Sequence, residues 1–154
     1  VSRQKKVISQ FKLIQSENPD TTIIIISHDF AFLNHLVDTY VVMFGGFVLE
    51  VIHDINNLYS KKSLHPYTAD LLSSLDPSSK NNQKETIDHF IDLTIKPQGC
   101  PYKVRCKVFA SGDRELQHKC ESELPPIVDS YSGEKVEKLN TDWQRCWYPF
   151  LEAK

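Results

Sequence analysis

The chain has 154 residues, of which 40% are hydrophobic and 25% are charged, as is typical of a globular protein with one core and an appendage. The formal net charge of -2, without a concentration of Lys and Arg, argues against nucleic acid as the main partner. No apolar run approaches the roughly 20 residues needed to cross a bilayer, and no segment resembles a signal peptide. We therefore expect a cytoplasmic protein that meets a membrane only through partners.

The first part of the chain predicts a helix followed by a strand. Residues 2–16 carry apolar side chains at helical spacing, and Asn18-Pro19-Asp20 follows as a helix breaker. Residues 21–26 read Thr-Thr-Ile-Ile-Ile-Ile, a continuous β-branched run typical of strands that are buried on both faces of a parallel sheet. This order of elements predicts an α/β fold.

A second helix and a hairpin come next. The helix takes its apolar face from Phe30, Leu33, Leu36 and Val37. Residues 41–44 and 47–51 are apolar and predict two strands. Gly45-Gly46 between them suits a two-residue turn, because glycine tolerates positive φ.

Shorter elements and a change of composition mark the second half. Residues 54–60 and 66–75 predict helices, the second with Pro66 in its first turn, where the missing N–H costs nothing. Residues 76–96 are rich in Ser, Asn, Lys and Asp and predict a linker. Residues 97–154 contain all four cysteines and are too short and loop-rich to build a large core, so we expect a small lobe that needs a staple.

His28 is the candidate functional residue of the first half. Ser27-His28-Asp29 follows the predicted strand directly, and ligands of parallel sheets gather at the carboxyl ends of their strands. A neutral imidazole at that position can donate an N–H to a phosphate oxygen and orient it. A structural alternative is that Ser27 or Asp29 only caps the following helix. A Ser-His-Asp hydrolase is disfavoured, because adjacent residues at a strand end point in different directions.

Three motifs, in the same order along the chain, resemble a known family. Residues 27–50, with Ser-His-Asp, a short helix and a strand pair, resemble the histidine switch region of ATP-binding cassette (ABC) ATPases. His65-Pro66-Tyr67 and the residues after it are similar to the tail motif of the oligopeptide and dipeptide importer ATPases. Gly99-Cys100-Pro101-Tyr102-Lys103-Val104-Arg105-Cys106 and Arg145-Cys146-Trp147-Tyr148 resemble the cysteine motifs of that subfamily.

The resemblance implies a fold class and a division into domains. The fold would be α/β, the C-terminal part of a P-loop NTPase (ABC ATPase) sheet followed by a small irregular cysteine-rich lobe. Residues 1–75 would be the C-terminal part of the nucleotide-binding domain, 76–96 the linker and 97–154 the oligopeptide-transporter C-terminal lobe. In this family the histidine reaches the γ-phosphate of ATP, so His28 is the implied catalytic and nucleotide-contacting residue. For His65 we expect a structural role at a helix start rather than metal binding.

Other elements of the family are missing from this sequence. It contains no GxxxxGK[ST] phosphate loop (Walker A), no LSGGQ-like signature and no apolar strand ending in Asp-Glu (Walker B). Together with a first residue Val1 instead of Met, this favours a truncated, split or alternatively started reading frame. We therefore expect a partial ATP-binding subunit of a peptide importer, which uses ATP with Mg²⁺ only in the complete protein and is inactive alone.

The four cysteines are the candidate metal ligands. Cys100, Cys106, Cys120 and Cys146 are separated by 5, 13 and 25 residues, which is not a paired CxxC pattern. Four thiolates can still hold a [4Fe-4S] cluster or Zn²⁺, and the resemblance favours the cluster. Cys120 is the doubtful ligand, because the family places its third cysteine closer to the second. Free thiols are the main alternative, and disulfides are disfavoured in a chain without a secretion signal.

The implied partners are those of a peptide importer. The resemblance implies a second ABC ATPase subunit, bound near His28, and permease subunits that hold the protein at the cytoplasmic face of the cell membrane. A rival hypothesis is a non-enzymatic interaction or regulatory module that is stapled by a metal or a cluster. A phosphate loop encoded upstream of Val1 would favour the ATPase over the module.

Overall fold

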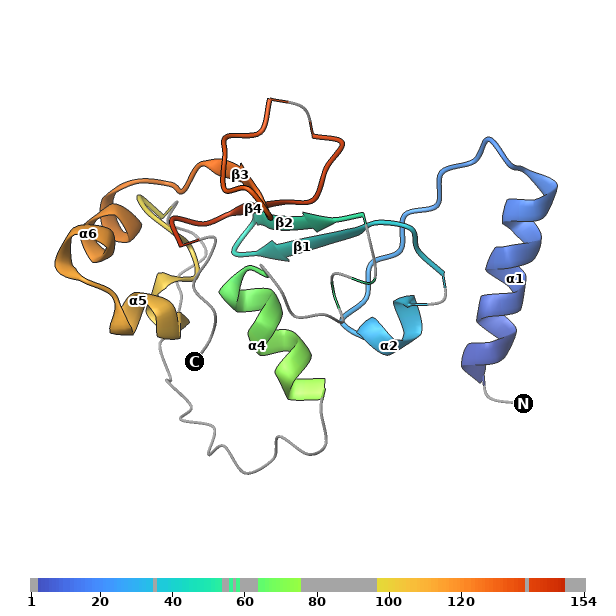
Figure 1. Ribbon diagram of the computed structural model, residues 1–154. Coiled ribbons are helices and arrows are strands. Elements are labelled where there is room, and N and C mark those ends of the chain that lie inside the picture. Colours follow the sequence, from blue (N-terminus) through green and yellow to red (C-terminus); the bar gives the residue numbers. More distant parts are fainter. Residues whose placement is uncertain are drawn as a thin grey trace. The chain divides into compact units, whose positions relative to one another are not determined.

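The computed structural model describes residues 3–34, 36–53, 56, 58, 64–75, 97–137 and 139–148 (Figure 1). The linker predicted for residues 76–96 and most of the helix predicted for 54–60 lie outside these residues. The chain divides into two units, Val1–Asp38 and Thr39–Lys154. No helix in the described part is both long and apolar enough to span a bilayer.

The first unit contains two helices joined by an extended segment. Helix α1 (Arg3–Glu17) confirms the predicted helix, whereas α2 (Phe30–Leu33) is shorter than predicted. Residues 21–27 lie in no strand, and Ile24 and Ile26 are 84% and 97% exposed. The prediction of a strand buried on both faces is thus wrong for this chain. A strand needs neighbours that pair with its N–H and C=O groups, and the described residues provide none for this segment.

The predicted hairpin is confirmed. Strands β1 (Tyr40–Phe44) and β2 (Phe47–Ile52) pair antiparallel around a two-residue turn. Gly45 and Gly46 in the turn have φ values of 57° and 82°, which an L side chain rarely adopts. The sequence signal was therefore correct down to the turn residues.

Two short strands from the C-terminal part extend this hairpin into a four-stranded sheet. Strands β3 (Ile127–Asp129) and β4 (Trp143–Arg145) complete the order β1-β2-β4-β3, with Glu50 of β2 opposite Gln144 of β4. Every pair in this sheet is antiparallel, and the parallel strand predicted at residues 21–26 is not part of it. The sheet thus joins segments that lie on either side of the predicted linker.

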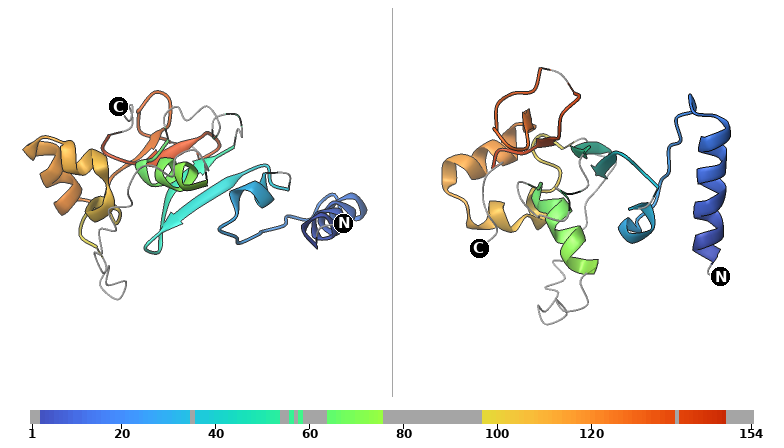
Figure 2. Two further views of the ribbon diagram at one scale, coloured as in Figure 1. Left: turned by 90° about the horizontal axis from the view of Figure 1, so that it is seen from below. Right: turned by 45° about the vertical axis from the view of Figure 1, so that its right-hand side comes forward.

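Helix α4 (Pro66–Leu75) has the predicted bounds and lies next to the hairpin (Figure 2). The ring of Tyr67 in its first turn packs on the ring of Phe44, with centroids 4.9 Å apart. Pro66 at the first helical position leaves no N–H unsatisfied there. This contact fixes the start of α4 against the end of β1.

The remaining helices are short and belong to the cysteine-rich part. They are the 3₁₀ helix η2 (Lys103–Arg105) and the α-helices α5 (Lys107–Ser111) and α6 (Arg114–Ser122), of which α5 and α6 lie side by side. Instead of a separate core, this part shares one buried cluster with the sheet, formed by Leu49, Cys100, Tyr102, Cys120, Cys146 and Tyr148. The separate lobe expected from the sequence is therefore not confirmed, and the division at residues 76–96 stays a prediction.

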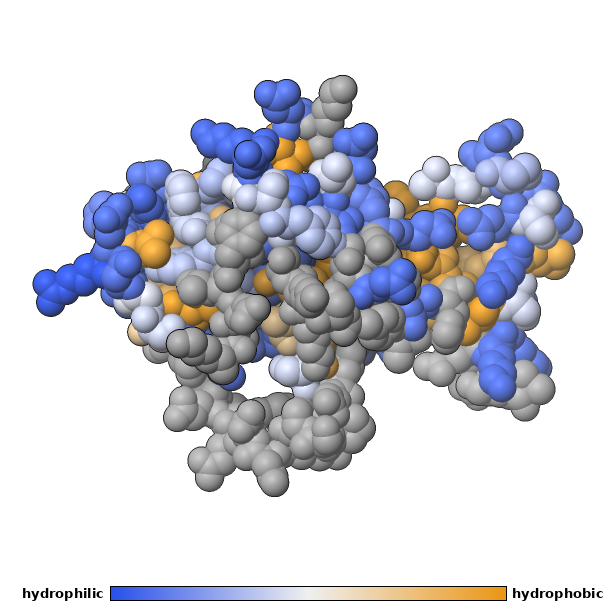
Figure 3. All heavy atoms as spheres, viewed as in Figure 1, coloured by the Kyte–Doolittle hydropathy of each residue, from blue (hydrophilic) through white to orange (hydrophobic). Residues whose placement is uncertain are grey.

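Apolar side chains also show at the surface (Figure 3). In the first unit these include Leu13, Ile14, Ile24 and Ile26, and in the hairpin they include Val41 and Met43 on the outer face of β1. Burial alternates along β1, so that Tyr40 and Val42 face the core while Val41 and Met43 are exposed.

Candidate functional site

His28 lies in an exposed turn directly before α2. The hydroxyl of Ser27 accepts a hydrogen bond from the backbone N–H of Asp29 at 3.0 Å. The carboxylate of Asp29 accepts one from the N–H of Phe32 at 2.9 Å, which makes Asp29 the N-cap of α2. Both neighbours of His28 thus bind backbone groups of the turn and of α2, as the structural alternative predicted. The imidazole is left as an exposed polar group that can reach a ligand.

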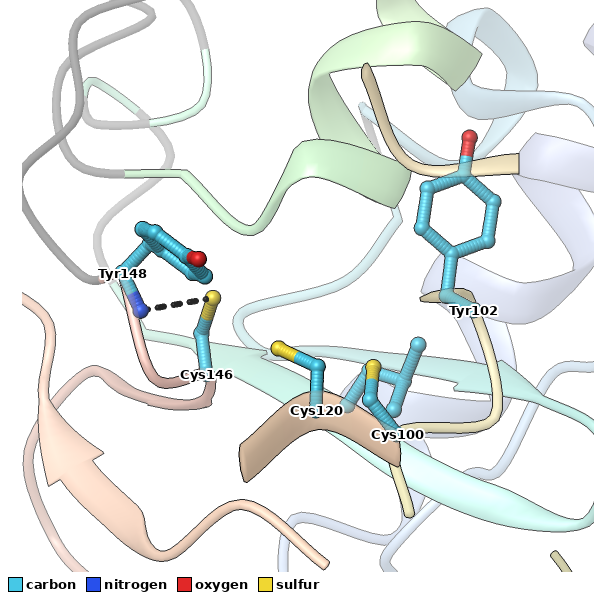
Figure 4. Close-up of a cluster of buried hydrophobic side chains, with 6 residues drawn as sticks. Cys100, Tyr102, Cys120, Cys146 and Tyr148 are labelled. Carbon is cyan, nitrogen blue, oxygen red and sulfur yellow. Dashed lines mark hydrogen bonds between the residues drawn. The ribbon is translucent and has the colours of Figure 1, made fainter. Parts of the chain in front are cut away.

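The four cysteines come from four separate segments of the second unit. Cys100 precedes η2, Cys106 is the N-cap of α5, Cys120 lies in α6 and Cys146 follows β4. Figure 4 shows Cys120 between Cys100 and Cys146, with Tyr102 and Tyr148 on either side. The cysteine that the sequence spacing left doubtful therefore lies among the others.

Burial keeps these thiols protonated. The pKa of Cys120 is raised to about 12, mainly by burial and in smaller part by the nearby Cys100 and Cys106. Burial is also the main cause of the raised pKa of Cys100, Cys106 and Cys146. The pKa of the Cys146 thiol responds to all three other thiols, so the four groups lie within electrostatic range of one another. Once one cysteine is ionised, its negative charge makes ionisation of a second cysteine less favourable, unless a nearby cation offsets both charges.

Backbone N–H groups point at three of the four sulfurs. The N–H of Phe109 donates to Sγ of Cys106 at 3.4 Å, and the N–H of Tyr148 donates to Sγ of Cys146 at 3.3 Å (Figure 4). Backbone N–H groups of Tyr102 and Lys103 lower the pKa of Cys100 in the same way, against the larger effect of burial. Such donors favour a thiolate over a thiol. They are placed where a metal-bound sulfur would need them.

The cysteines are free thiols in this arrangement. Within the described ranges, no group of three or more His, Cys, Asp or Glu side chains is positioned to hold a metal ion. The arrangement of the described residues is therefore not in itself a metal site, either for Zn²⁺ or for a cluster.

Gly99 allows two segments of the cysteine site to meet. The backbone N–H of Cys100 donates to the carbonyl oxygen of Cys120 at 2.8 Å. A Cβ atom at Gly99 would overlap that same carbonyl oxygen and the backbone of Glu121. Only glycine permits this approach, and Gly99 was not among the predicted site residues.

The residues around His65 form a buried polar group, and the His65 ring is in contact with the ring of Tyr102 in the buried cluster. His65 is 1% exposed, and its Nδ1 accepts a hydrogen bond from the backbone N–H of Tyr67 at 3.1 Å. Glu50 of β2 is fully buried, and its Oε1 accepts the backbone N–H of His65 at 3.0 Å. The expected structural role of His65 is in keeping with these contacts. Glu50 was not among the predicted site residues, and it is the only charged residue of the otherwise apolar strand β2.

Comparisons with known proteins give a consistent result for most of the chain. It is 30% identical over 141 residues to an oligopeptide transport ATP-binding protein of Haemophilus influenzae, and 32% identical over 141 residues to a putative one of Bacillus subtilis. A dipeptide transport ATP-binding protein of Bacillus subtilis is 33% identical over 108 residues. These matches cover 88%, 88% and 69% of this chain, but only 40%, 40% and 31% of the respective relatives. No model of a protein family matches the chain.

Proposed function

We infer that this chain, a homologue of oligopeptide and dipeptide transport ATP-binding proteins, is the histidine- and cysteine-bearing part of the ATP-binding subunit of a peptide importer. The observation that carries this proposal is the exposed turn of His28, whose flanking residues Ser27 and Asp29 fix the backbone on either side. A histidine held in this way can present one ring nitrogen to a phosphate oxygen.

The role proposed for His28 is to donate an N–H to the terminal phosphate of ATP. Phosphoryl transfer to water depends mainly on positioning and on electrostatic stabilisation, and a neutral imidazole can supply both. The residues that would bind Mg²⁺ and the remaining phosphates are not in this sequence, which contains no phosphate loop. The isolated chain should therefore neither bind ATP tightly nor hydrolyse it.

A chimera tests this role. In it, the present chain replaces the matched segment of the Haemophilus influenzae relative, so that a phosphate loop from the relative would be joined to His28. We expect the chimera to hydrolyse ATP and the His28→Ala variant to lose at least about tenfold of that rate. His53→Ala is the matched control, because His53 is also exposed but lies in the second unit. Equal rates for the parent and the His28→Ala chimera would refute the role.

The partners follow from the same proposal. An importer would pair this subunit with a second ATPase subunit near His28 and with permeases in the membrane. It would thus act at the cytoplasmic face of the membrane. The exposed isoleucines of residues 21–27 provide apolar surface for contacts within the longer subunit.

For the cysteines we propose a [4Fe-4S] cluster, with Cys100, Cys106, Cys120 and Cys146 as its ligands. The support is the gathering of four thiols from four segments of the chain in one buried cluster and the N–H groups directed at sulfur. Such a group would act as a clamp, because it would join α5, α6 and β4 to the segment before η2. Zinc is the alternative occupant.

Anaerobic purification followed by iron, sulfide and zinc analysis tests the cluster. We expect about four iron and four sulfide per chain and a broad visible absorption, both reduced in Cys120→Ser. Cys120 is the informative position, because its place in the sequence spacing is unusual. A colourless preparation without iron would refute the cluster, and about one zinc per chain would favour the alternative.

A second candidate function is a non-enzymatic interaction or regulatory module stapled by the cluster. The observation that favours it is that the cysteines, the sheet and α4 all lie within one unit, Thr39–Lys154, whereas His28 lies in the other. An inactive chimera combined with a loaded cysteine site would support this module over the ATPase.

A further inference from the structure

Among the residues that the structure describes, no cationic side chain pairs with the buried carboxyl group of Glu50. It is fully buried in β2, and its Oε1 accepts the backbone N–H of His65 at 3.0 Å. Across the residues that the structure describes, the one ion pair joins Lys119 to Glu115 on the surface of α6. An ionised carboxylate buried without a countercharge is costly, so this environment favours the neutral acid.

The imidazole of His65 does not supply the missing charge. Its Nδ1 accepts the N–H of Tyr67 at 3.1 Å, which places the ring proton on Nε2. The backbone of Arg145 acts on the ring, and the hydrogen bond that joins His65 to the Glu50 carboxyl comes from the backbone N–H and not from the imidazole. Burial lowers the pKa of His65 to about 4, against a smaller effect of the Arg145 backbone. The ring is therefore neutral at physiological pH.

Within the described part of the chain, the groups that act on this pair come from several elements. Burial raises the pKa of Glu50 to about 7, the Thr68 hydroxyl and the N–H of His65 oppose this rise, and Asp142 adds to it. On the His65 side the neighbouring titratable ring is Tyr102, whose centroid is 6.1 Å from that of the imidazole. Neither Asp142 nor Tyr102 would stabilise a negative charge on Glu50.

We propose that Glu50 and His65 form a proton-dependent latch, in which a neutral carboxyl and a neutral imidazole together hold the start of α4 against strands β2 and β4. Ionisation of Glu50 as the pH rises places an uncompensated charge between these elements and loosens their packing. The latch is a positioning device and contacts no substrate.

The latch also reaches the cysteine site. Gln144, opposite Glu50 in the sheet, lies two residues before Cys146, and Arg145, whose backbone acts on the His65 ring, directly precedes it. Loosening β4 would therefore displace Cys146. This consequence for a cluster depends on the function proposed for the cysteines, whereas the latch itself does not.

Proton linkage gives the latch a specific signature. Because the pKa of Glu50 is raised on folding, its contribution to stability is fully present below pH 4.5 and is lost as the pH rises to about 7. Because the pKa of His65 is lowered on folding, its contribution to stability is fully present above pH 6.5 and is lost as the pH falls to about 4. Between 4.5 and 6.5 the two effects oppose each other. The pair then holds one proton in both states, on the carboxyl when folded and on the imidazole when unfolded.

Two single variants separate the opposing effects. In Glu50→Gln only the histidine effect remains, so stability rises with pH from 4 to 6.5 and does not fall beyond it. In His65→Gln only the carboxyl effect remains, so stability falls between pH 4.5 and 7. Each slope approaches a tenfold change in the unfolding equilibrium constant per pH unit, about the value for one proton. Glu115→Gln, at the exposed surface of α6, is the control and keeps the wild-type profile.

The experiment is denaturant unfolding of the metal-free, reduced chain at pH 4 to 8, followed by tryptophan fluorescence. Both tryptophans of the chain, Trp143 and Trp147, flank Cys146, so the signal reports on β4. The latch predicts the two opposite slopes. It is overturned if Glu50→Gln keeps the wild-type profile, or if it lowers stability equally at every pH.

A measurement on the wild-type chain tests the latch even if the variants do not fold. Carbon-13 NMR of the glutamate carboxyls should show one group that titrates near pH 7. Titration of every glutamate below about pH 5, as in model peptides, overturns the latch. On chains loaded anaerobically with iron and sulfide, Glu50→Gln should retain the visible absorption longer than wild type at pH 8. If no cluster assembles in either chain, the proposal for the cysteines fails, and the unfolding profiles still decide the latch.

Discussion

The phenol of Tyr102 donates a hydrogen bond to the carboxylate of Asp70, and so attaches the residue two places after Cys100 to helix α4. The rings of Tyr102 and Tyr67 also pack together, with centroids 5.1 Å apart. The His-Pro-Tyr segment and the first cysteine segment are therefore parts of one packing unit. Substitutions at the start of α4 should therefore also alter the packing around Cys100, through the contact with Tyr102.

Replacing Tyr102 with Phe should lower the free energy of unfolding by about 1–2 kcal/mol, because a partly buried carboxylate loses its donor. Denaturant unfolding measures this. Asp70→Asn is the partner variant, and the double variant should lose less than the sum of the two single losses. Additive losses would mean that the two groups do not act on each other.

Replacing Gly99 with Ala should destabilise the chain by about 1–3 kcal/mol, because the new methyl group overlaps the carbonyl of Cys120. It should also expose the cysteines to alkylation. Gly46→Ala is the matched comparison, since that site has a positive φ but open space around it. We expect Gly46→Ala to cost stability through its backbone conformation while leaving the cysteine site unreactive. Similar thiol reactivity in both variants would contradict this account.

The metal-free thiols should react slowly with iodoacetamide at pH 8. Burial raises the pKa of all four, so the thiolate that reacts is scarce at that pH. Denaturant should restore the rate of an ordinary thiol. Mass spectrometry of the alkylated peptides identifies each cysteine, and rapid native-state labelling of Cys120 or Cys146 would be inconsistent with the structure.

Replacing both Ile24 and Ile26 with Lys should reduce aggregation of the isolated chain and change its unfolding free energy by less than about 0.5 kcal/mol, because both side chains are exposed. Light scattering measures the aggregation, and denaturant unfolding measures the change in unfolding free energy. Ile52→Lys is the contrasting variant, since Ile52 is 2% exposed and its loss should unfold the second unit. A large loss of stability in the double variant would show that the isoleucines are packed.

The sequence predicted correctly those helices and turns whose conformation is determined by a few neighbouring residues. The helical spacing of residues 2–16, the Gly45-Gly46 turn and Pro66 each specify conformation within a few residues, and α1, the hairpin and α4 follow. The run at residues 21–26 predicted a buried strand, but burial depends on neighbours that the composition of the run cannot supply.

The candidate site could be predicted only in part. Cysteine residues were evident as candidate ligands, yet the contact between Gly99 and Cys120 depends on packing between segments far apart in the chain. Glu50 was missed for the same reason, because its partner His65 comes from another element. The joining of β4 to β2 also arises from tertiary packing and has no local signal.

The affinity of the chimera for ATP relative to ADP, measured by calorimetry, tests the role of His28 most directly. If the imidazole contacts the terminal phosphate, His28→Ala should weaken binding of ATP by about tenfold, the value of one charge-assisted hydrogen bond, and leave that of ADP unchanged. An equal loss for both nucleotides, or no loss for either, would contradict the assignment of His28 as the residue that faces the phosphate.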